Sequence, residues 1–351
     1  MKALVVHPGP NYSVADVYKN IVAGLLANGV EVAEHNLDAR LNFYMGAHVK
    51  KDGVLVPAFG EQDAVLMAAK GLEVACYEWW PDVVILVSGF FIPPQVLGVL
   101  ALRPHHVVLW CTEAPYEDDR HQRLARYVDT VIVNDPVSID TYRAVNPRTW
   151  YMPHMWNPAL HVPCGTPPQY DFGWVGTGFK SRIEFFEACD FGDLDVRLGG
   201  NWQELPEGHP LDRYLIRDRT ECMHNEETVE LYQQSKTSMN WYRKEVSEHG
   251  TSLGWAVGPR EVELAATGTF FLREARGEGD GLFPMLPTFE TPAEFSDKLA
   301  WWCRHDTERD EAATAALAAV ADRSNDQVMA RFVRLVDGVP KVFQPSLEPV
   351  S

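Results

Sequence analysis

The sequence predicts an α/β protein built from two Rossmann-like domains, whose parallel sheets face each other across a cleft. Three observations support this prediction. The chain has 351 residues, which is enough for two ordinary domains with buried cores. Short apolar strand signals alternate with helical segments in two successive series, as in βαβ units. A proline-rich stretch separates the two series.

The first series predicts an N-terminal domain over residues 1–155. Its strand signals are short apolar runs, and a helical stretch separates each run from the next. The expected strands are Ala3–His7, Val30–His35, Asp82–Val87, His106–Cys111 and Thr130–Asn134. The order of strands and helices favours a parallel sheet, in which ligands bind at the carboxyl ends of the strands.

The second series follows a segment that contains five prolines between residues 152 and 169, and we expect the linker at residues 156–169. The second domain is predicted over residues 170–324. A final helix and tail, residues 325–351, are expected to pack back on the first domain. The expected strands and helices of the second domain are Tyr170–Val175, Lys180–Cys189, Asp195–Leu198, Thr228–Gln234, Thr237–Trp241, Pro259–Thr267 and Thr269–Leu272.

The net charge of −18 restricts the partners. A protein that grips many nucleic-acid phosphates needs a broad basic face, which this composition makes scarce. Duplex DNA is therefore disfavoured as a partner, although a locally basic cleft is not excluded. A small anion such as a nucleotide diphosphate remains compatible, because two or three basic side chains and backbone N–H groups suffice to hold it.

The sequence gives no sign of a metal site, a disulfide framework or a membrane segment. The six cysteines lie far apart without a C-x-x-C pair, and we find no Asp-x-Asp cluster in a loop suited to Mg²⁺. The N-terminal apolar run is too short for a signal peptide or a membrane span. We therefore expect a cytoplasmic protein without a membrane span.

A glycine-containing loop follows the first strand of the second domain. Gly176, Thr177 and Gly178 allow close approach of a ligand to the backbone, and the following helix offers free N–H groups to an anion. Lys180 and Arg182 add positive charge in the first helical turn, where they oppose the helix dipole unless an anion is bound. The alternative is a tight turn with solvated charges.

A second basic segment opens the helix at Pro259. Arg260 and Glu263 are three residues apart and share a face of that helix. A guanidinium there pairs well with a diphosphate, and a carboxylate accepts two hydrogen bonds from the vicinal hydroxyls of a ribose. The alternative is an exposed ion pair within the helix.

The stretch from residue 170 to about 320 resembles the C-terminal domain of the spore-maturation-protein (CgeB-type) glycosyltransferase-like family, a branch of the GT-B enzymes. The matching pieces are Asp171–Gly176 with Arg182, Leu198–Trp202, Ser235–Trp241 with Asn240, Arg260-x-x-Glu263 with Ala266 and Gly268, Leu282–Phe283 and Thr291–Cys303. The resemblance implies that Glu263 binds a ribose and that Arg182 and Arg260 bind a diphosphate. Many such enzymes carry a further glutamate eight positions earlier, where this chain has Trp255, which leaves the transferred sugar open.

Three more side chains are candidates for the nucleotide site. Trp202, which follows a strand, is a candidate for stacking on the base, although aromatic residues at strand ends are usually part of the core. His224, just before a helix, is a candidate wall of the base pocket. Asn240 completes the set through the resemblance.

Candidates for catalysis lie in and near the first domain. An inverting transferase needs a general base near the acceptor hydroxyl. His7 follows the first strand, Glu113 follows a central strand, and His154 lies in the proline-rich stretch. For Glu113 the alternative is that it only decorates a helix N-terminus, where acidic residues are favoured.

Together these features predict a metal-independent glycosyltransferase that moves a sugar from a UDP or GDP type donor to an unknown acceptor, without a separate cofactor. The acceptor classes that remain open are a protein, a glycan, a small molecule or a modified DNA base. Three alternatives remain: a nucleotide-sugar epimerase, an NAD-dependent oxidoreductase, and a non-catalytic surface-binding module. The oxidoreductase is the weaker enzyme alternative, because Ser181 stands where the dinucleotide fingerprint has its third glycine.

Overall fold

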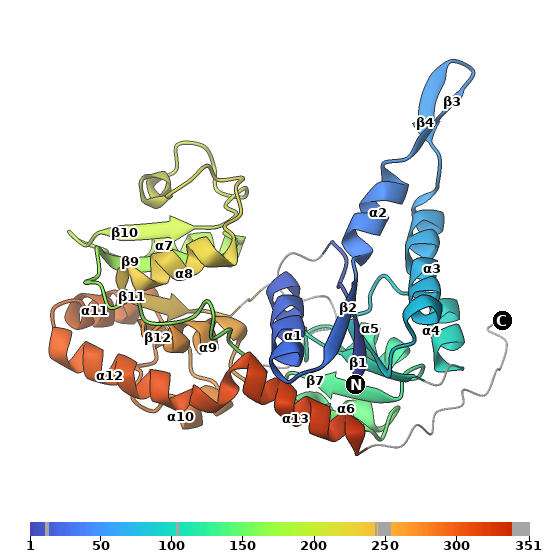
Figure 1. Cartoon of the computed structure of the whole chain (residues 1–351). Coiled ribbons are helices and arrows are strands. Elements are labelled where there is room, and N and C mark those ends of the chain that lie inside the picture. The colour runs from blue at the N-terminus through green and yellow to red at the C-terminus, as the bar shows by residue number, and fades with distance from the viewer. Residues whose placement is uncertain (11–13, 103–104, 243, 245–253, 339–351) are drawn as a thin grey trace. The chain divides into compact units, whose positions relative to one another are not determined.

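A computed structural model describes residues 1–10, 14–102, 105–242, 244 and 254–338 (Figure 1). The chain forms two compact units, which we describe separately. Unit 1 comprises the described residues of Met1–Pro153, Gly250–Gly254 and Asn325–Ser351. Unit 2 comprises the described residues of His154–His249 and Trp255–Ser324.

Unit 1 is a six-stranded parallel sheet with the strand order β2-β1-β5-β6-β7-β8. The strands are β1 (Lys2–Val6), β2 (Glu31–His35), β5 (Val83–Val87), β6 (His106–Trp110), β7 (Thr130–Val133) and β8 (Thr149–Tyr151). The helices are α1 (Ala15–Ala27), α2 (Leu37–Met45), α3 (Glu61–Trp79), α4 (Pro94–Ala101), α5 (Asp118–Ala125), α6 (Ile139–Arg143) and α13 (Asn325–Asp337).

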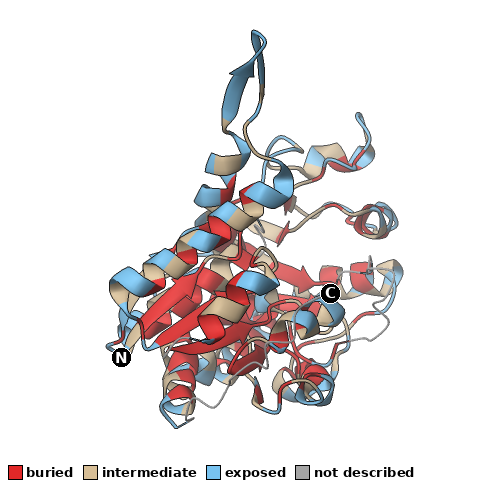
Figure 2. Cartoon of the chain, turned by 90° about the vertical axis from the view of Figure 1, so that its right-hand side faces the viewer, coloured by how far each residue is buried: buried red, intermediate tan, exposed pale blue. Residues whose placement is uncertain are grey.

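The central strands of this sheet consist mostly of apolar residues because helices cover both faces, as in other parallel sheets. All residues of β5 and β6 are buried, and Figure 2 shows the sheet as a continuous buried layer. The strand order reverses between β1 and β5, so the switch point of this sheet lies at their carboxyl ends. His7 and Ser88 follow these two strands.

Unit 1 also contains a hairpin that the sequence did not reveal. Strands β3 (His48–Lys51) and β4 (Val54–Pro57) pair in an antiparallel fashion between α2 and α3. Asp52 and Gly53 form the turn, both with positive φ, which is the conformation that a two-residue hairpin turn requires. The hairpin extends away from the sheet of unit 1 (Figure 1).

The last helix belongs to unit 1, which is where the sequence placed it. It packs closely on α1, since a Cβ atom on Gly24 would lie 2.4 Å from the carbonyl oxygen of Asn325. Phe332 reaches the end of β6, with its ring centroid 5.4 Å from that of Trp110. A chain segment more than 150 residues away in sequence therefore completes the core of this unit.

Unit 2 is a smaller parallel sheet with the strand order β10-β9-β11-β12. The strands are β9 (Tyr170–Val175), β10 (Val196–Gly199), β11 (Ser235–Asn240) and β12 (Phe270–Arg273). The helices are α7 (Lys180–Glu187), α8 (Asn225–Gln233), α9 (Pro259–Ala266), α10 (Gly277–Leu282), α11 (Pro292–Trp302) and α12 (Asp306–Ala319).

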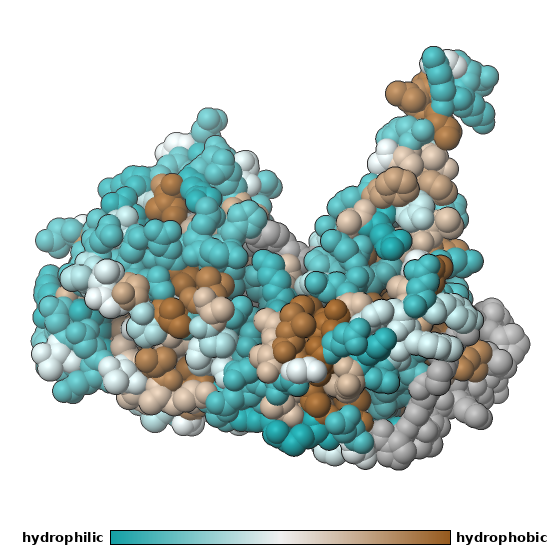
Figure 3. All heavy atoms as spheres, in the orientation of Figure 1, coloured by the Kyte–Doolittle hydropathy of each residue, from teal (hydrophilic) through white to brown (hydrophobic). Residues whose placement is uncertain are grey.

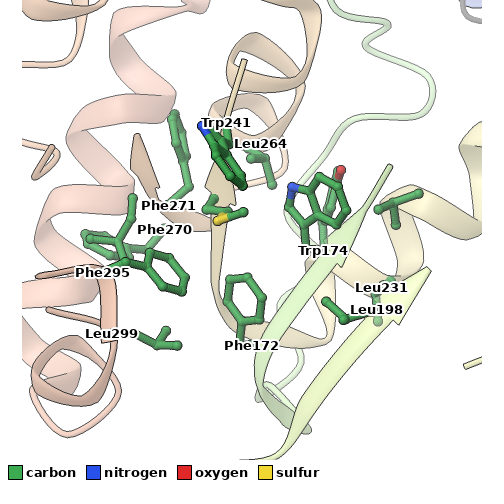
Figure 4. Close-up of a cluster of buried hydrophobic side chains, with 14 of the residues drawn as sticks. Phe172, Trp174, Leu198, Leu231, Trp241, Leu264, Phe270, Phe271, Phe295 and Leu299 are labelled. Atoms are coloured by element: carbon green, nitrogen blue, oxygen red, sulfur yellow. The ribbon is translucent and has the colours of Figure 1, made fainter. Parts of the chain in front are cut away.

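The core of unit 2 is rich in aromatic side chains (Figure 4). Phe172 and Trp174 lie on the same face of β9 and are completely buried. Phe172 contacts Phe295 of α11 edge to face, with the ring centroids 5.6 Å apart. These packed rings hold β9 and its carboxyl-terminal loop in a fixed position against the helices.

The segment expected as a linker, residues 156–169, is part of unit 2. Trp156 donates its backbone N–H to the carbonyl of Arg323 at 3.1 Å and its indole N–H to the carbonyl of Val320 at 2.8 Å. The side chain of His161 is fully buried. The prolines prevent helices and strands here but not packing, so the first boundary between the units falls between Pro153 and His154.

Candidate functional site

The strand order of unit 2 places its switch point between β9 and β11. Ligands of open parallel sheets bind at the carboxyl ends of the strands at such a point. Arg182 of α7 lies across it. One Nη atom donates to the carbonyl of Thr177 at 2.9 Å, and the other donates to the carbonyl of Trp241 at 3.3 Å. The guanidinium therefore joins the loop after β9 to the end of β11.

A second guanidinium lies near the same aromatic ring as the first. The Cζ atoms of Arg182 and Arg260 lie 5.2 Å and 5.1 Å from the ring centroid of Trp174, so both cations contact the same indole. A Cβ atom on Gly176 would lie 3.1 Å from Nη2 of Arg260. The structure thus brings the segments 176–182 and 260–263 together, as the sequence analysis expected.

Tyr232 of α8 positions Arg260, and no sequence pattern pointed to it. Its side chain is buried, and burial is the main reason why the pKa of its phenol is raised. A hydrogen bond with Arg260 opposes that rise in pKa. Arg260 makes no ion pair with any carboxylate among the described residues. Its charge is therefore available to an anion from outside.

Glu263 lies on the same helix as Arg260, but the ion-pair contact of its carboxylate is with His161. Its Oε1 lies 3.8 Å from Nε2 of His161, and its side chain is 14% exposed. The backbone N–H of Asn157 donates to Nδ1 of His161 at 2.9 Å, so the neutral ring carries its proton on Nε2, toward the carboxylate. Burial lowers the pKa of His161 to about 4, which keeps the ring neutral.

Glu261 fixes the start of α9, and the sequence analysis did not single it out. The side chain is fully buried, and its Oε2 accepts from the backbone N–H of Gly258 at 2.8 Å and from the hydroxyl of Tyr242. Burial raises the pKa of Glu261 to about 7. The only sequence signal for it is the capping-box position, three residues after Gly258.

The glycines of the loop after β9 are also required by packing, because a side chain there would clash with neighbouring residues. A Cβ atom on Gly178 would lie 2.3 Å from the ring of Trp202, and one on Gly200 would lie 2.5 Å from the carbonyl oxygen of Gly176. Trp202 is completely buried and donates its indole N–H to the carbonyl of Gly199 at 3.0 Å. It lies in the core and offers no ring face to a base, which corrects its placement in the binding site.

The other predicted binding residues differ in their accessibility. Lys180 is exposed and pairs with Glu184 at 3.8 Å on the outer face of α7. His224 is exposed at the start of α8, where its backbone N–H donates to Glu227 at 3.1 Å. Asn240 ends β11, and its buried Nδ2 has no hydrogen-bond partner among the described residues. Thr177 supplies the carbonyl that Arg182 binds.

Of the catalytic candidates, His7 lies at the switch point of unit 1. The backbone N–H of Gly9 donates to its Nδ1 at 3.2 Å, so the neutral ring carries its proton on Nε2. Burial lowers the pKa of His7, with Asp38 and Glu34 opposing this effect. The role of His7 as a general base stays a prediction.

Glu113 is partly buried in the loop after β6. This loop is tied to the next one by Asn134, whose side chain accepts from the backbone N–H of Ala114 at 3.1 Å and donates to its carbonyl at 3.3 Å. Glu113 accepts at its carbonyl from the backbone N–H of Glu117 at 3.0 Å. The loop is therefore a rigid support for the Glu113 side chain.

His154 belongs to unit 2, close to the start of α9. Burial lowers its pKa to about 4, and the nearby carboxylate of Glu278 opposes that shift. Glu278 accepts from the backbone N–H of Val257 at 2.7 Å and from Nη2 of Arg323 at 2.6 Å. The half-exposed ring of Trp255 lies beside Gly277, the residue that precedes Glu278. His154, Glu278 and Arg323 therefore form a polar cluster next to the helix that carries Arg260 and Glu263.

A cavity of about 120 Å³ in unit 2 lies at the opposite end of the sheet. It is lined by residues at the amino ends of β11 and β12, including Ser235 and Thr269, together with Cys164. It is too small for a nucleotide, and ligands of parallel sheets bind at the other edge.

In the part of the chain that the structure describes, no three His, Cys, Asp or Glu side chains are grouped to hold a metal ion. Every described helix is too short or too polar to cross a bilayer.

Comparison with known proteins agrees with this fold. A family model described as "Glycosyl transferase-like" matches residues 182–334. No curated protein matches the chain in sequence. The structure resembles the sucrose-phosphate synthase from Thermosynechococcus elongatus at 12% identity and a TM-score of 0.65, covering 96% of this chain and 98% of the other.

Two further solved structures are similar. HepE of Anabaena, in complex with UDP and glucose, is 12% identical with a TM-score of 0.63, covering 97% of this chain and 100% of the other. A glycosyltransferase involved in avilamycin A biosynthesis is 16% identical with a TM-score of 0.56, covering 96% and 97%. The fold is therefore that of the GT-B class, as the sequence predicted. The family model matches the part of the chain that carries Arg182, Arg260 and Glu263.

Proposed function

We propose that the protein is a glycosyltransferase whose donor is a UDP-sugar bound at the carboxyl edge of the sheet of unit 2. The observation that carries this proposal is the convergence of the Arg182 and Arg260 guanidiniums on Trp174, beside the loop at Gly176. Two cations near one buried ring raise each other's electrostatic energy, and a bound anion lowers it. UDP is chosen because it is the nucleoside diphosphate in the HepE complex.

In this proposal the diphosphate lies against the two guanidiniums and the loop after β9, and Glu263 accepts hydrogen bonds from the ribose hydroxyls. The bond between the anomeric carbon and the diphosphate oxygen breaks, and the acceptor oxygen forms the new bond to that carbon. The negative charge that develops on the departing UDP is stabilised by Arg182 and Arg260. The proton of the acceptor hydroxyl passes to a base that we do not assign.

The two guanidiniums supply the charge that Mg²⁺ supplies in other enzymes, and we therefore propose that transfer does not require a metal. We propose the polar cluster of His154, Glu278 and Arg323 as a candidate contact for the sugar end of the donor. The acceptor stays open among the classes given above. The CgeB-type branch of the family and a cytoplasmic location also stay predictions.

The proposal is tested by thermal shift with a panel of UDP, GDP, UDP-glucose, GDP-mannose, NAD and NADP. A ligand that binds only the folded state raises the melting temperature, and at a hundredfold excess over its dissociation constant it stabilises by about 2.7 kcal/mol. We expect UDP and at least one UDP-sugar to raise the melting temperature in buffer that contains EDTA. NAD and NADP are expected to leave it unchanged.

The same panel separates the alternatives. Stabilisation by NAD or NADP without UDP would assign the chain to the oxidoreductases. An epimerase would convert the sugar of its donor without releasing UDP, so UDP release in the presence of candidate acceptors identifies a transferase. A chain that none of these nucleotides stabilises would contradict the proposal and favour the surface-binding module.

A further inference from the structure

The α2, β3, β4 and α3 segment of unit 1, which we call the arm, presents an unusual surface. Every residue of β3 is exposed, as are all residues of β4 except Val56 (Figure 2). Val54 and Leu55, next to the turn, are 63% and 69% exposed. Figure 3 shows hydrophobic surface on the hairpin. A two-stranded hairpin without a partner is only marginally stable in water, and apolar strand edges are sites of pairing with other chains.

A row of exposed side chains runs along α3 below the hairpin. Met67, Lys70, Val74 and Tyr77 are all exposed, although three of the four are apolar. Their spacing of three, four and three residues is that of a seam along which two helices pack. Residues on the buried face of the helix, such as Leu72, already pack in the core of unit 1. The exposed row is thus a second packing face that unit 1 does not use.

The row is complementary to itself when two copies of α3 run antiparallel. The midpoint of the row lies at residue 72, so Met67 then faces Tyr77 and Lys70 faces Val74 of the second copy. The aliphatic stem of Lys70 covers apolar surface while its ammonium reaches Glu73 of the second helix. The same patch therefore serves both copies, which is the property of a two-fold symmetric interface.

The charges at the two ends of the arm fit the same arrangement. The hairpin carries His48, Lys50 and Lys51, which are exceptions in a chain with a net charge of −18. The far end of α3 carries Glu78 and the exposed ring of Trp80. Antiparallel pairing brings the basic and apolar hairpin of one copy toward the acidic and aromatic helix end of the other, and the hairpin lysines offset the exposed Glu61 and Asp63 in the first turn of α3.

We propose that the arm is a dimerisation element and that its partner is a second copy of this chain, paired antiparallel along α3. The proposal is independent of the donor site in unit 2. It explains why the row on α3 and the hairpin are both apolar and exposed, because each becomes buried in the dimer.

Sedimentation equilibrium of the full chain at micromolar concentration tests this proposal. We expect the wild type to be a dimer and Met67→Glu to raise the dissociation constant at least about tenfold, because the carboxylate would be buried against the ring of Tyr77 of the second copy. The matched control is Leu26→Glu on α1, which is 55% exposed and outside the arm. It should remain a dimer. Thermal melting of both variants checks that they are folded.

A charge exchange gives a second test that does not place a charge in an apolar contact. Lys70→Glu is expected to weaken the dimer, and the double variant Lys70→Glu with Glu73→Lys should restore it. A monomeric wild type, or a Met67→Glu variant that dimerises as tightly as the wild type, would overturn the proposal. If the monomeric wild type instead co-sediments with phosphatidylglycerol vesicles, the arm binds membranes rather than a second copy.

Discussion

Replacing Arg260 with Ala is expected to weaken UDP binding by about tenfold to a hundredfold, the range of a lost charge-assisted hydrogen bond to a phosphate. Arg260 makes no ion pair with a described carboxylate, so its removal leaves no carboxylate unpaired among these residues. The buried Tyr232 hydroxyl loses its partner in this variant, so the melting temperature without ligand should fall, and binding is compared at a temperature at which both proteins are folded. Isothermal titration with UDP measures the effect, and Arg304→Ala, at an exposed arginine of unit 2, is the matched control.

Glu263→Ala separates the ribose contact from the diphosphate contact. This variant should also lose affinity for UDP, but inorganic pyrophosphate should still compete with UDP as it does in the wild type. Arg260→Ala should lose both ligands together. Wild-type affinity for UDP in both variants would refute the placement of the nucleotide at α9. Equal loss of pyrophosphate binding in Glu263→Ala would show that this residue acts only by supporting Arg260.

Glu261→Gln is expected to remove a pH dependence from the stability of the protein. Burial raises the pKa of Glu261 from 4.5 to about 7, so the folded state holds this proton more tightly than the unfolded state. The stabilising contribution is complete below pH 4.5 and is lost as the pH rises through 7. Since one pKa unit corresponds to about 1.4 kcal/mol, the loss is on the order of 3 kcal/mol.

The glutamine keeps acceptors for Gly258 and Tyr242 but does not ionise. The difference in unfolding free energy between wild type and variant, measured with urea from pH 4.5 to 8, should therefore change in favour of the variant as the pH rises. The difference isolates Glu261 from the buried histidines, which titrate in both proteins. Glu207→Gln, at an exposed position of unit 2, serves as the control. A difference that stays constant with pH would show that Glu261 is ionised throughout this range.

The sequence predicted the alternation of strands and helices because the periodicity of apolar residues is a local property. It located β9, β11 and α9 within a few residues, and it identified Arg182, Arg260 and Glu263 from charges in unusual positions. It missed the hairpin at residues 48–57, because a solvated hairpin lacks the buried alternation that marks a strand. It also assigned residues 156–169 to a linker, since prolines hide packing that involves distant residues such as Val320.

The residues that support Arg260 and Glu263 could not be predicted from the sequence. Tyr232 and His161 contact Arg260 and Glu263 only because α8 and the segment before β9 are brought to α9 by the sheet. Trp202 illustrates the opposite error. An aromatic residue after a strand fits both a core position and a base-stacking position, and only its burial against Gly178 distinguishes the two.

The sequence by itself therefore determined the α/β class, the two series of elements and the charged residues that open α7 and α9. The tertiary structure alone decided that Arg182 and Arg260 share the ring of Trp174, that Glu261 rather than Glu263 is buried, and that Trp202 belongs to the core. The physical reason is that periodicity and charge are written along the chain. Burial and convergence depend on which strands become neighbours, and that order is set by packing over the whole domain.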